Sequence, residues 1–259
     1  MISVAVAGAQ GRMGGEVIRA VTAASDMEVV AQVDVKPLGP GWQGVGRPFT
    51  DLHEALEDTK PQVLVDFTIA DAAFENALTA LDAGVRPVIG TTGMRPDQLQ
   101  RIGDKATEQR TGAFVAPNFA LGVVLTMHFA RIASRYFDSA EVIELHHDQK
   151  IDAPSGTGVW IAQNMANARG KPFRMNVPEK ETLPGGRGAE YEGVRVHSVR
   201  LPGLVAHHEV LFGGEGQILT IRHDSMDRNS FMPGVLIAIR EVLGLDRLVV
   251  GLDNLLHLQ

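Results

Sequence analysis

Residues 144–158 (ELHHDQKIDAPSGTG) concentrate side chains that can transfer protons and bind anions. The segment holds two histidines, a lysine and a serine–glycine–threonine turn between a predicted strand and a predicted helix. Histidine titrates near neutral pH, so one of the pair can donate a proton while the other orients or binds a substrate. Because adjacent strand residues point to opposite faces, His146 and His147 cannot both ligate one metal ion, and we predict no zinc site here.

Lys150 and the turn Ser155-Gly156-Thr157 predict an anion site in the same segment. The lysine is a compact cation with three donors, which can hold a carboxylate or protonate a substrate atom. The turn opens a helix, where hydroxyls and free backbone N–H groups converge. Each feature also has a plain structural explanation, as a solvated loop lysine and as a serine N-cap. Taken together they predict a substrate with at least one carboxylate.

A second group of residues predicts a dinucleotide site near the start of the chain. A glycine-rich turn follows the first predicted strand and opens the first predicted helix; it consists of Gly8, Ala9, Gln10, Gly11, Arg12, Met13 and Gly14. The glycines permit a tight turn, close approach of backbone N–H groups to a pyrophosphate, and close packing of helix on strand. The spacing GxxGxxG is a variant of the commoner GxGxxG, and glycine turns also simply join strands to helices.

Asp34 gives this turn its context, because an acidic residue at the end of the second strand can bind the adenosine ribose hydroxyls. A solvated loop carboxylate is the alternative. Arg12 and Lys36 are cations that could hold a 2′-phosphate, whereas Asp34 favours NADH. We therefore expect NADH, NADPH or both as cofactor.

Two more predicted strand ends carry loops that can line a nicotinamide pocket. One loop is Gly90-Thr91-Thr92-Gly93 and the other is Ala116-Pro117-Asn118-Phe119. In open α/β sheets, ligands bind in the crevice at the carboxyl ends of the strands. Each loop by itself is also explained by ordinary turn chemistry.

The elements that must position these residues follow from hydrophobic periodicity. Strands are predicted at residues 2–7, 27–35, 63–67, 88–90 and 113–116, and helices at 11–24, 51–58, 71–83 and 96–107. Residues 36–48, rich in glycine and proline, predict a surface loop. The alternation of strand and helix predicts an α/β fold with a Rossmann-type, doubly wound parallel sheet.

The pattern changes after a long predicted helix at residues 120–137. Strands follow at 140–147, 194–200, 208–212 and 217–223, and residues 179–193 predict a mobile, glycine-rich loop. The tail at 230–243 is helical in pattern, with Pro233 acceptable in its first turn. This order of several strands with few helices between them predicts a second, α+β domain.

Composition narrows the function classes. The chain has 24 basic and 31 acidic residues, a net charge of −7, which argues against general nucleic-acid binding. The absence of cysteine excludes disulfides, thiolate metal sites and a cysteine nucleophile. We see no secretory signal, and no apolar stretch reaches the roughly 18 residues that span a bilayer. A soluble cytoplasmic protein without a metal is expected.

The chain resembles the dihydrodipicolinate reductase family of the bacterial diaminopimelate and lysine pathway over nearly its whole length. The motifs that carry the resemblance are VAGAQGRMG, VDFT, GTTG, APNF, ELHHDQKIDAPSGT and the ending VGLDNLL. Departures are small: Met94 and Gly158 stand where phenylalanine and alanine are common, and Gln10 occupies a variable position. None of these departures removes a functional group.

The resemblance implies NAD(P)H-dependent reduction of 4-hydroxy-tetrahydrodipicolinate, with hydride delivered to the carbon conjugated with the cyclic imine. It implies that His146 and Lys150 are catalytic and that His147, Lys150, Ser155, Gly156 and Thr157 bind the dicarboxylate. Cofactor contacts would come from residues 8–13, Asp34, 90–92 and 116–119. His128, His207, His208 and His223 are expected to be structural or near the cleft rim.

The resemblance also implies a homotetramer built through the sheet of the second domain. Its C-terminal helix would return to the nucleotide domain, giving a dinucleotide-binding domain at 1–118 and 229–259 and a substrate-binding and tetramerisation domain at 119–228. Two other readings stay open at this point. Another nicotinamide dehydrogenase of similar architecture would not need the segment HHDQKIDAPSGT, and a redox-sensing binding protein without turnover would not need its proton donors.

Overall fold

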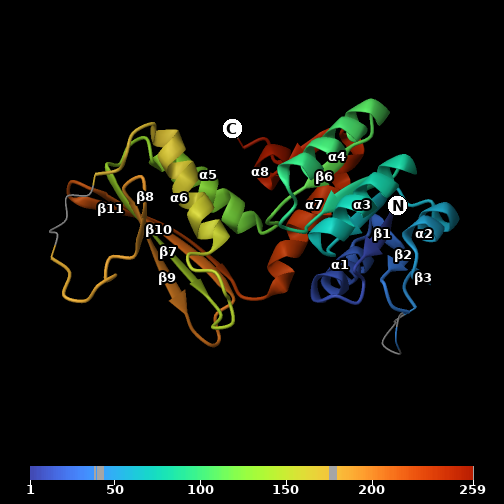
Figure 1. Ribbon diagram of the computed structural model, residues 1–259, viewed down its shortest axis with the longest axis horizontal. Coiled ribbons are helices and arrows are strands. Elements are labelled where there is room, and N and C mark those ends of the chain that lie inside the picture. The colour runs from blue at the N-terminus through green and yellow to red at the C-terminus, as the bar shows by residue number, and fades with distance from the viewer. Residues whose placement is uncertain (38, 40–43, 175–179, 259) are drawn as a thin grey trace. The chain divides into compact units, whose positions relative to one another are not determined.

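The computed structural model describes residues 1–37, 39, 44–174 and 180–258, and its contacts divide the chain into two compact units (Figure 1). Unit 1 comprises Met1–Leu121 and Arg228–Gln259, and unit 2 comprises Gly122–Asp227. The domain limits predicted from the sequence differ from these by one to three residues. The C-terminal segment belongs to the same unit as the N-terminal one.

Unit 1 contains a seven-stranded sheet in which all neighbouring strands are parallel. Its strands are β1 (Ile2–Ala7), β2 (Met27–Val33), β3 (Arg47–Phe49), β4 (Val63–Asp66), β5 (Arg86–Ile89), β6 (Ala113–Val115) and β12 (Leu248–Val250). They are ordered β12-β6-β5-β4-β1-β2-β3. The strand order reverses between β1 and β4, so the predicted doubly wound sheet is confirmed.

Helices cover both faces of this sheet, which explains why its strands read as continuous apolar runs. The helices are α1 (Arg12–Ala23), α2 (Leu52–Thr59), α3 (Ala70–Asp82), α4 (Pro96–Gln109), α7 (Met232–Glu241) and the short α8 (Leu252–Leu255). Helices α2, α3 and α4 pack side by side, and α1 packs beside α7 (Figure 1). Val4, Ala5 and Val6 at the centre of β1 are completely buried.

Two short strands of unit 1 were not predicted. Arg47 and Pro48, assigned to a loop, lie in β3, where the proline is tolerated because β3 is an edge strand. Strand β12 has only three residues, too few for a periodicity to appear. Residues 38 and 40–43 of the predicted loop lie outside the described residues. The tail helix divides into 3₁₀ turns at Arg228–Phe231 and Val242–Gly244 on either side of α7, and Pro233 does lie in the first turn of α7.

Unit 2 contains a five-stranded mixed sheet with two helices. Its elements are α5 (Leu121–Ala133), β7 (Ser139–His146), α6 (Gly156–Arg169), β8 (Ala189–Tyr191), β9 (Val194–Arg200), β10 (Ala206–Gly214) and β11 (Gln217–Ser225). The strands are ordered β11-β10-β7-β9-β8. The β7 and β9 pair is parallel and the other pairs are antiparallel, which confirms the predicted α+β character.

One face of the unit 2 sheet changes from apolar to polar along β7. Its buried residues alternate as Ala140, Val142, Glu144 and His146. The first two belong to an apolar core with side chains of α5 and α6. The last two lie on the same face but at the other end, so the strand delivers a carboxylate and an imidazole to buried positions.

Strands β10 and β11 extend beyond the predicted 208–212 and 217–223, and three other predicted limits in unit 2 are wrong. The helix expected at 120–137 ends at Ala133, where the Ser134 hydroxyl donates to the Ala130 carbonyl at 2.6 Å and the chain turns. The strand expected at 140–147 ends at His146, which leaves His147 outside it. The loop expected at 179–193 contains β8, which pairs with β9; residue 179 lies outside the described residues. Within the described ranges, no helix is both long and apolar enough to cross a membrane.

Candidate active site

A pocket of about 590 Å³ lies in unit 1 at the carboxyl ends of β1, β2 and β4. Residues of the glycine-rich turn, Asp34 and the segment after β4 line it together; they include Gly8, Gln10, Asp34, Lys36, Thr68 and Asn76. The pocket sits where the strand order reverses, the place at which α/β sheets bind ligands. The structure thus brings the predicted turn and Asp34 to one site.

Asp34 holds the turn in place as well as facing this pocket. Its Oδ2 accepts a hydrogen bond from the Gln10 backbone N–H at 2.8 Å, and the Gln10 side chain donates to the Lys36 carbonyl at 2.9 Å. Three residues that the sequence predicted separately are therefore linked by direct contacts. The Asp34 side chain is neither a distant nor a freely solvated loop carboxylate.

The glycines stand where a side chain would strain the backbone or overlap neighbouring protein atoms, so the tight turn and its packing depend on them. Gly8 has a φ of +74°, and a Cβ on Gly14 would lie 2.1 Å from the Gly8 carbonyl oxygen. A Cβ on Gly90 would lie 2.1 Å from the Phe67 ring. Gly11 is the N-cap of α1, so within the described residues no side chain caps the helix, and its first N–H groups have no side-chain acceptor that would compete with an anion. The turn fits a pyrophosphate.

The other predicted cofactor residues are placed in different ways. Thr91 is buried and donates its hydroxyl to the Thr68 carbonyl at 3.2 Å, whereas Thr92 is exposed. The Asn118 side chain accepts from the Ala120 N–H at 2.9 Å. Phe119 is 2% exposed and its ring packs against Phe67, with centroids 5.8 Å apart. Its side chain belongs to the core, so only the Phe119 backbone remains for a ligand.

Sequence reasoning missed the residues that shape the pocket from β4. Asp66 is completely buried and accepts hydrogen bonds from the Thr68 N–H at 2.8 Å, the Thr68 hydroxyl at 2.6 Å and the Asn76 amide at 2.7 Å. Burial raises the pKa of Asp66 despite these bonds. The motif VDFT at the end of a buried strand was the available signal, since strand ends of this type carry ligand-binding loops.

We expect Gly14→Ala to abolish the dinucleotide site. Its Cβ would overlap the Gly8 carbonyl oxygen, so the turn must move, at a cost of about 1–3 kcal/mol in unfolding free energy. Titration calorimetry with NADH and urea unfolding measure the two effects. Gly15→Ala is the matched control, because its Cβ would have only the Arg19 guanidinium, 3.9 Å away, as a neighbour. NADH binding by Gly14→Ala equal to that of Gly15→Ala would contradict the prediction.

The second set of predicted residues lies in unit 2 around one buried carboxylate. Glu144 is completely buried, and its Oε2 is 2.5 Å from His146 Nδ1. The Arg200 guanidinium donates to both carboxylate oxygens, at 2.9 and 2.8 Å. The Ser155 N–H donates to Oε1 at 3.0 Å. Burial by itself would raise the pKa of Glu144, but the hydrogen bonds, led by that from His146, outweigh it and hold the pKa well below its ordinary range.

Lys150 and the start of α6 meet at a second carboxylate, that of Asp152. Lys150 Nζ donates to Asp152 Oδ1 at 2.7 Å, and the Gly156 N–H donates to Oδ2 at 3.2 Å. The hydrogen bond from Lys150 lowers the pKa of Asp152. Arg200 donates to the Asp152 backbone carbonyl at 2.6 Å, so the guanidinium that pairs with Glu144 also holds the backbone at Asp152. The predicted anion site thus grips a carboxylate of its own chain.

The remaining predicted residues of this segment have distinct positions. His146 is 7% exposed, whereas His147 is exposed and its carbonyl accepts from the Lys150 N–H at 3.2 Å. Ser155 is buried and caps α6, its hydroxyl accepting from the Gly158 N–H at 3.1 Å. Thr157 is half-buried in the first turn of α6. The serine is therefore an N-cap, with its hydroxyl already engaged.

His208 is a buried neighbour that sequence reasoning did not connect to the site. It is 2% exposed, and its ring meets that of His146 edge to face, with centroids 5.4 Å apart. In the described part of the chain neither ring nitrogen of His208 has a hydrogen-bond partner. Burial lowers the pKa of His208 to about 3, and the neighbouring His146 adds to this. The contact between the two histidine rings depends on the register of β7 with β10, in which His208 pairs with Glu144.

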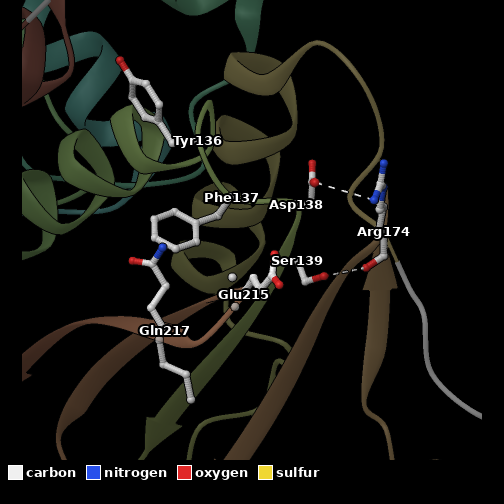
Figure 2. Close-up of a pocket in the computed structure, with 10 residues that line it drawn as sticks. Tyr136, Phe137, Asp138, Ser139, Arg174, Glu215 and Gln217 are labelled. Atoms are coloured by element: carbon white, nitrogen blue, oxygen red, sulfur yellow. Dashed lines mark hydrogen bonds and ion pairs between the residues drawn. The ribbon is translucent and has the colours of Figure 1, made fainter.

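A cavity of about 810 Å³ lies at the opposite end of β7 (Figure 2). Residues of the turn after α5 and of the β10–β11 hairpin line it, including Phe137, Asp138, Ser139, Arg174, Glu215 and Gln217. Ser139 begins β7 and His146 ends it, so this cavity is removed from the histidine by the length of the strand. Among the described residues, no group of three or more histidine and acidic side chains is arranged to hold a metal ion.

Comparisons with known proteins agree over the whole chain. Residues 2–119 match the family model described as dihydrodipicolinate reductase, N-terminus, and residues 122–256 match dihydrodipicolinate reductase, C-terminus. A protein named 4-hydroxy-tetrahydrodipicolinate reductase from Geobacillus kaustophilus is 49% identical over 263 residues, which cover 99% of each chain. One of the same name from Listeria monocytogenes is 50% identical over 260 residues, 98% of this chain and 99% of that protein.

Solved structures show the same relationship. The dipicolinate-bound dihydrodipicolinate reductase from Paenisporosarcina sp. TG-14 is similar with a TM-score of 0.92 and 45% identity, over 98% of this chain and 99% of that one. An amine dehydrogenase from Mycobacterium smegmatis shares the fold at 15% identity, with a TM-score of 0.67 over 97% of this chain and 95% of that one.

Proposed function

We infer the roles of the site residues from one premise: the chain belongs to the dihydrodipicolinate reductase family. Its reaction is the NAD(P)H-dependent reduction of 4-hydroxy-tetrahydrodipicolinate to tetrahydrodipicolinate in lysine and diaminopimelate biosynthesis. We propose that His146 and Lys150 supply protons, and that Lys150, His147, Ser155, Gly156 and Thr157 bind the substrate. The observation that carries this proposal is the carboxylate of Asp152 held between Lys150 Nζ and the Gly156 N–H.

The cofactor is NADH or NADPH, which when bound supplies a hydride to the carbon conjugated with the cyclic imine of the substrate. In unit 1 the residues that would hold it are those of the glycine-rich turn, Asp34 and the backbone after β5 and β6. The tight turn that Gly8 and Gly14 permit, which opens α1 without a side-chain cap among the described residues, supports this assignment. Lys36, whose carbonyl is fixed by Gln10, lines the same pocket as Asp34 and could pair with a 2′-phosphate.

His146 is proposed to act as a proton donor at the carboxyl end of β7. His146 is the last residue of β7, and its backbone carbonyl accepts a hydrogen bond from the Leu201 N–H at 3.1 Å. This bond fixes the end of the strand that carries the ring. A proton donor must be positioned before the reaction, since a misplaced imidazole loses most of its effect.

Lys150 is proposed to release Asp152 and take a substrate carboxylate in its place. The ammonium and the Gly156 N–H already converge on two oxygens of one carboxylate, the geometry that a substrate carboxylate requires. Holding the ring by its carboxylate fixes the reacting carbon, and orientation of this kind supplies much of the rate. Protonation by His146 or Lys150 then completes the reduction as water is lost.

One assay tests the proposed function. Purified protein is mixed with NADH or NADPH and the freshly made product of dihydrodipicolinate synthase, and nicotinamide absorbance is followed. We expect oxidation of the cofactor with wild-type protein and a loss of at least about 100-fold in kcat with His146→Gln. His128→Gln, a change on α5, is the control. Absence of oxidation with either cofactor would instead favour a different dehydrogenase or a dinucleotide sensor.

We also propose that the protein is a cytoplasmic homotetramer assembled through the sheet of unit 2. Its edge strand β11 supports this, because six of its nine residues are exposed, with Ile218 76% and Leu219 37% accessible. An exposed edge strand with apolar side chains is a common site of association. Light scattering coupled to size exclusion should give four times the 27.9 kDa chain mass, and a monomer would rule the assembly out.

A further inference from the structure

We propose that Glu144 is a positioning residue of the reaction, which fixes the ring of His146 with its proton on Nδ1 and so assigns proton transfer to Nε2. This inference rests on the proposed role of His146 and goes beyond it, because it identifies the group that makes one nitrogen the donor. It follows from the contacts of a single carboxylate with three elements of unit 2.

Both oxygens of Glu144 are occupied by donors. Oε2 faces His146 Nδ1 at 2.5 Å and Arg200 Nη1 at 2.9 Å, while Oε1 accepts from Arg200 Nη2 at 2.8 Å and from the Ser155 N–H at 3.0 Å. An ionised carboxylate only accepts hydrogen bonds, so the atom facing it must carry a proton. On His146 that atom is Nδ1.

Arg200 keeps this carboxylate ionised and stationary. Its guanidinium pairs with Glu144 in the bidentate manner that is both strong and directional. It also donates to the carbonyls of Asp152 and Val199, at 2.6 and 2.8 Å, so it cannot swing away without losing further bonds. The hydrogen bonds from His146 and, next to it, from Arg200 keep the pKa of Glu144 low despite its burial. His146 therefore faces a fixed acceptor.

The other charged or titratable neighbour of His146 does not compete for its protons. His208 of β10 packs edge to face against the ring and stays neutral as pH falls, because burial lowers its pKa to about 3. The groups around the His146 ring are thus Glu144 on β7, Arg200 on β9 and His208 on β10. Of these, only the carboxylate can hold the Nδ1 proton.

The same carboxylate connects the proton donor with the substrate-binding turn. Glu144 accepts a hydrogen bond from the backbone N–H of Ser155, the N-cap of α6. The N–H of the following residue, Gly156, donates to Asp152. Residue 144 lies two positions before His146 on the same face of β7, so one strand carries both the imidazole and its anchor. A change in Glu144 would let the ring rotate and mix its two tautomers.

The first measurement is made on the wild-type protein. Long-range proton–nitrogen NMR of protein labelled at histidine nitrogens, with His146→Gln to assign the signals, reports which ring nitrogen is protonated. We expect a protonated Nδ1, whether the ring is neutral or cationic. A bare Nδ1 with a protonated Nε2 would overturn the inference, even if the enzyme is fully active.

The second measurement compares matched variants. Glu144→Asp keeps the charge but withdraws the carboxylate by one methylene, and Glu144→Gln keeps the size but removes the charge. We expect kcat to fall at least about 100-fold in both, with the Kd of dipicolinate for Glu144→Asp within about threefold of wild type. Glu141→Gln is the control: it lies on the same strand, and its Oε2 makes the like contact with His197 Nε2 at 2.8 Å.

Each outcome is decisive. A Glu144→Asp variant that turns over as fast as Glu141→Gln would overturn the positioning role, whereas a wild-type protein without turnover would count against the proposed function instead. If Glu144→Gln fails to fold, Glu144→Asp and the wild-type spectrum still decide the question. A parallel loss of dipicolinate binding and kcat in Glu144→Asp would show a merely structural role and would also overturn it.

Discussion

Lys150→Ala should lower kcat/KM by about three orders of magnitude, the equivalent of ~4 kcal/mol in transition-state stabilisation. The lysine is proposed both to grip a substrate carboxylate and to supply a proton, and alanine removes both contributions. Its side chain is only partly exposed, 23% accessible, so the charge is poorly replaced by water. Initial rates at varied substrate and saturating NADPH give kcat and KM separately.

Two further variants separate the roles of this lysine. Lys150→Arg keeps a cation for the carboxylate but offers a group that does not release its proton, so KM should recover more than kcat. Lys171→Ala removes an exposed lysine of the same unit and should leave both constants unchanged. Turnover by Lys150→Ala at the wild-type rate would remove the residue from the site.

The free energy of unfolding of unit 2 should fall by about 1.4 kcal/mol per pH unit below pH 6.5 because of His208. Burial lowers the pKa of this histidine from 6.5 to about 3 in the folded protein. The unfolded chain takes up a proton as pH falls through 6.5, whereas the folded protein does not. The contribution is thus fully present above pH 6.5 and is lost progressively as pH approaches 3.

Urea unfolding at pH 7, 6 and 5 and constant protein concentration measures this slope. Trp160 lies in α6 of unit 2, so its fluorescence in a Trp42→Phe background follows that unit. His208→Leu should reduce the slope by one proton, because it removes the titrating ring. His53→Gln, a change at an exposed position of α2, should not alter it. Equal slopes in wild type and His208→Leu would contradict the buried neutral histidine.

Local patterns predicted most of unit 1, because each element there carries its own periodicity. Strand β1 is a short apolar run that ends at the glycine-rich turn, and the residues at its carboxyl end must lie beside those of the neighbouring parallel strands. Asp34 and the glycine-rich turn could therefore be brought together from the sequence. Strands β3, β8 and β12 could not, since three residues hold too little pattern and owe their form to a paired neighbour.

The proton-donor site was predicted in part. His146, Lys150 and Gly156 lie in one segment whose residue types indicate proton transfer and anion binding. Arg200 is 56 residues from Glu144 along the chain, and their contact depends on the register of β7 with β9. Glu144 itself was within reach, because residues two apart on a strand share a face. The prediction that Phe119 contacts cofactor needs narrowing to its backbone, because its ring is in the core.

In the free enzyme, the carboxylate of Asp152 serves as the counter-ion of Lys150. To bind at Lys150, phosphate or chloride must displace the Asp152 carboxylate, which is tethered two residues away. The effective concentration of this carboxylate is on the order of millimolar or above. A simple inorganic anion exchanges one ion pair for another and gains little. A substrate ring makes contacts in addition to those of its carboxylate, and the binding free energy they add allows it to displace Asp152. The tethered carboxylate therefore selects organic acids of the right shape over the abundant inorganic salts of the cell.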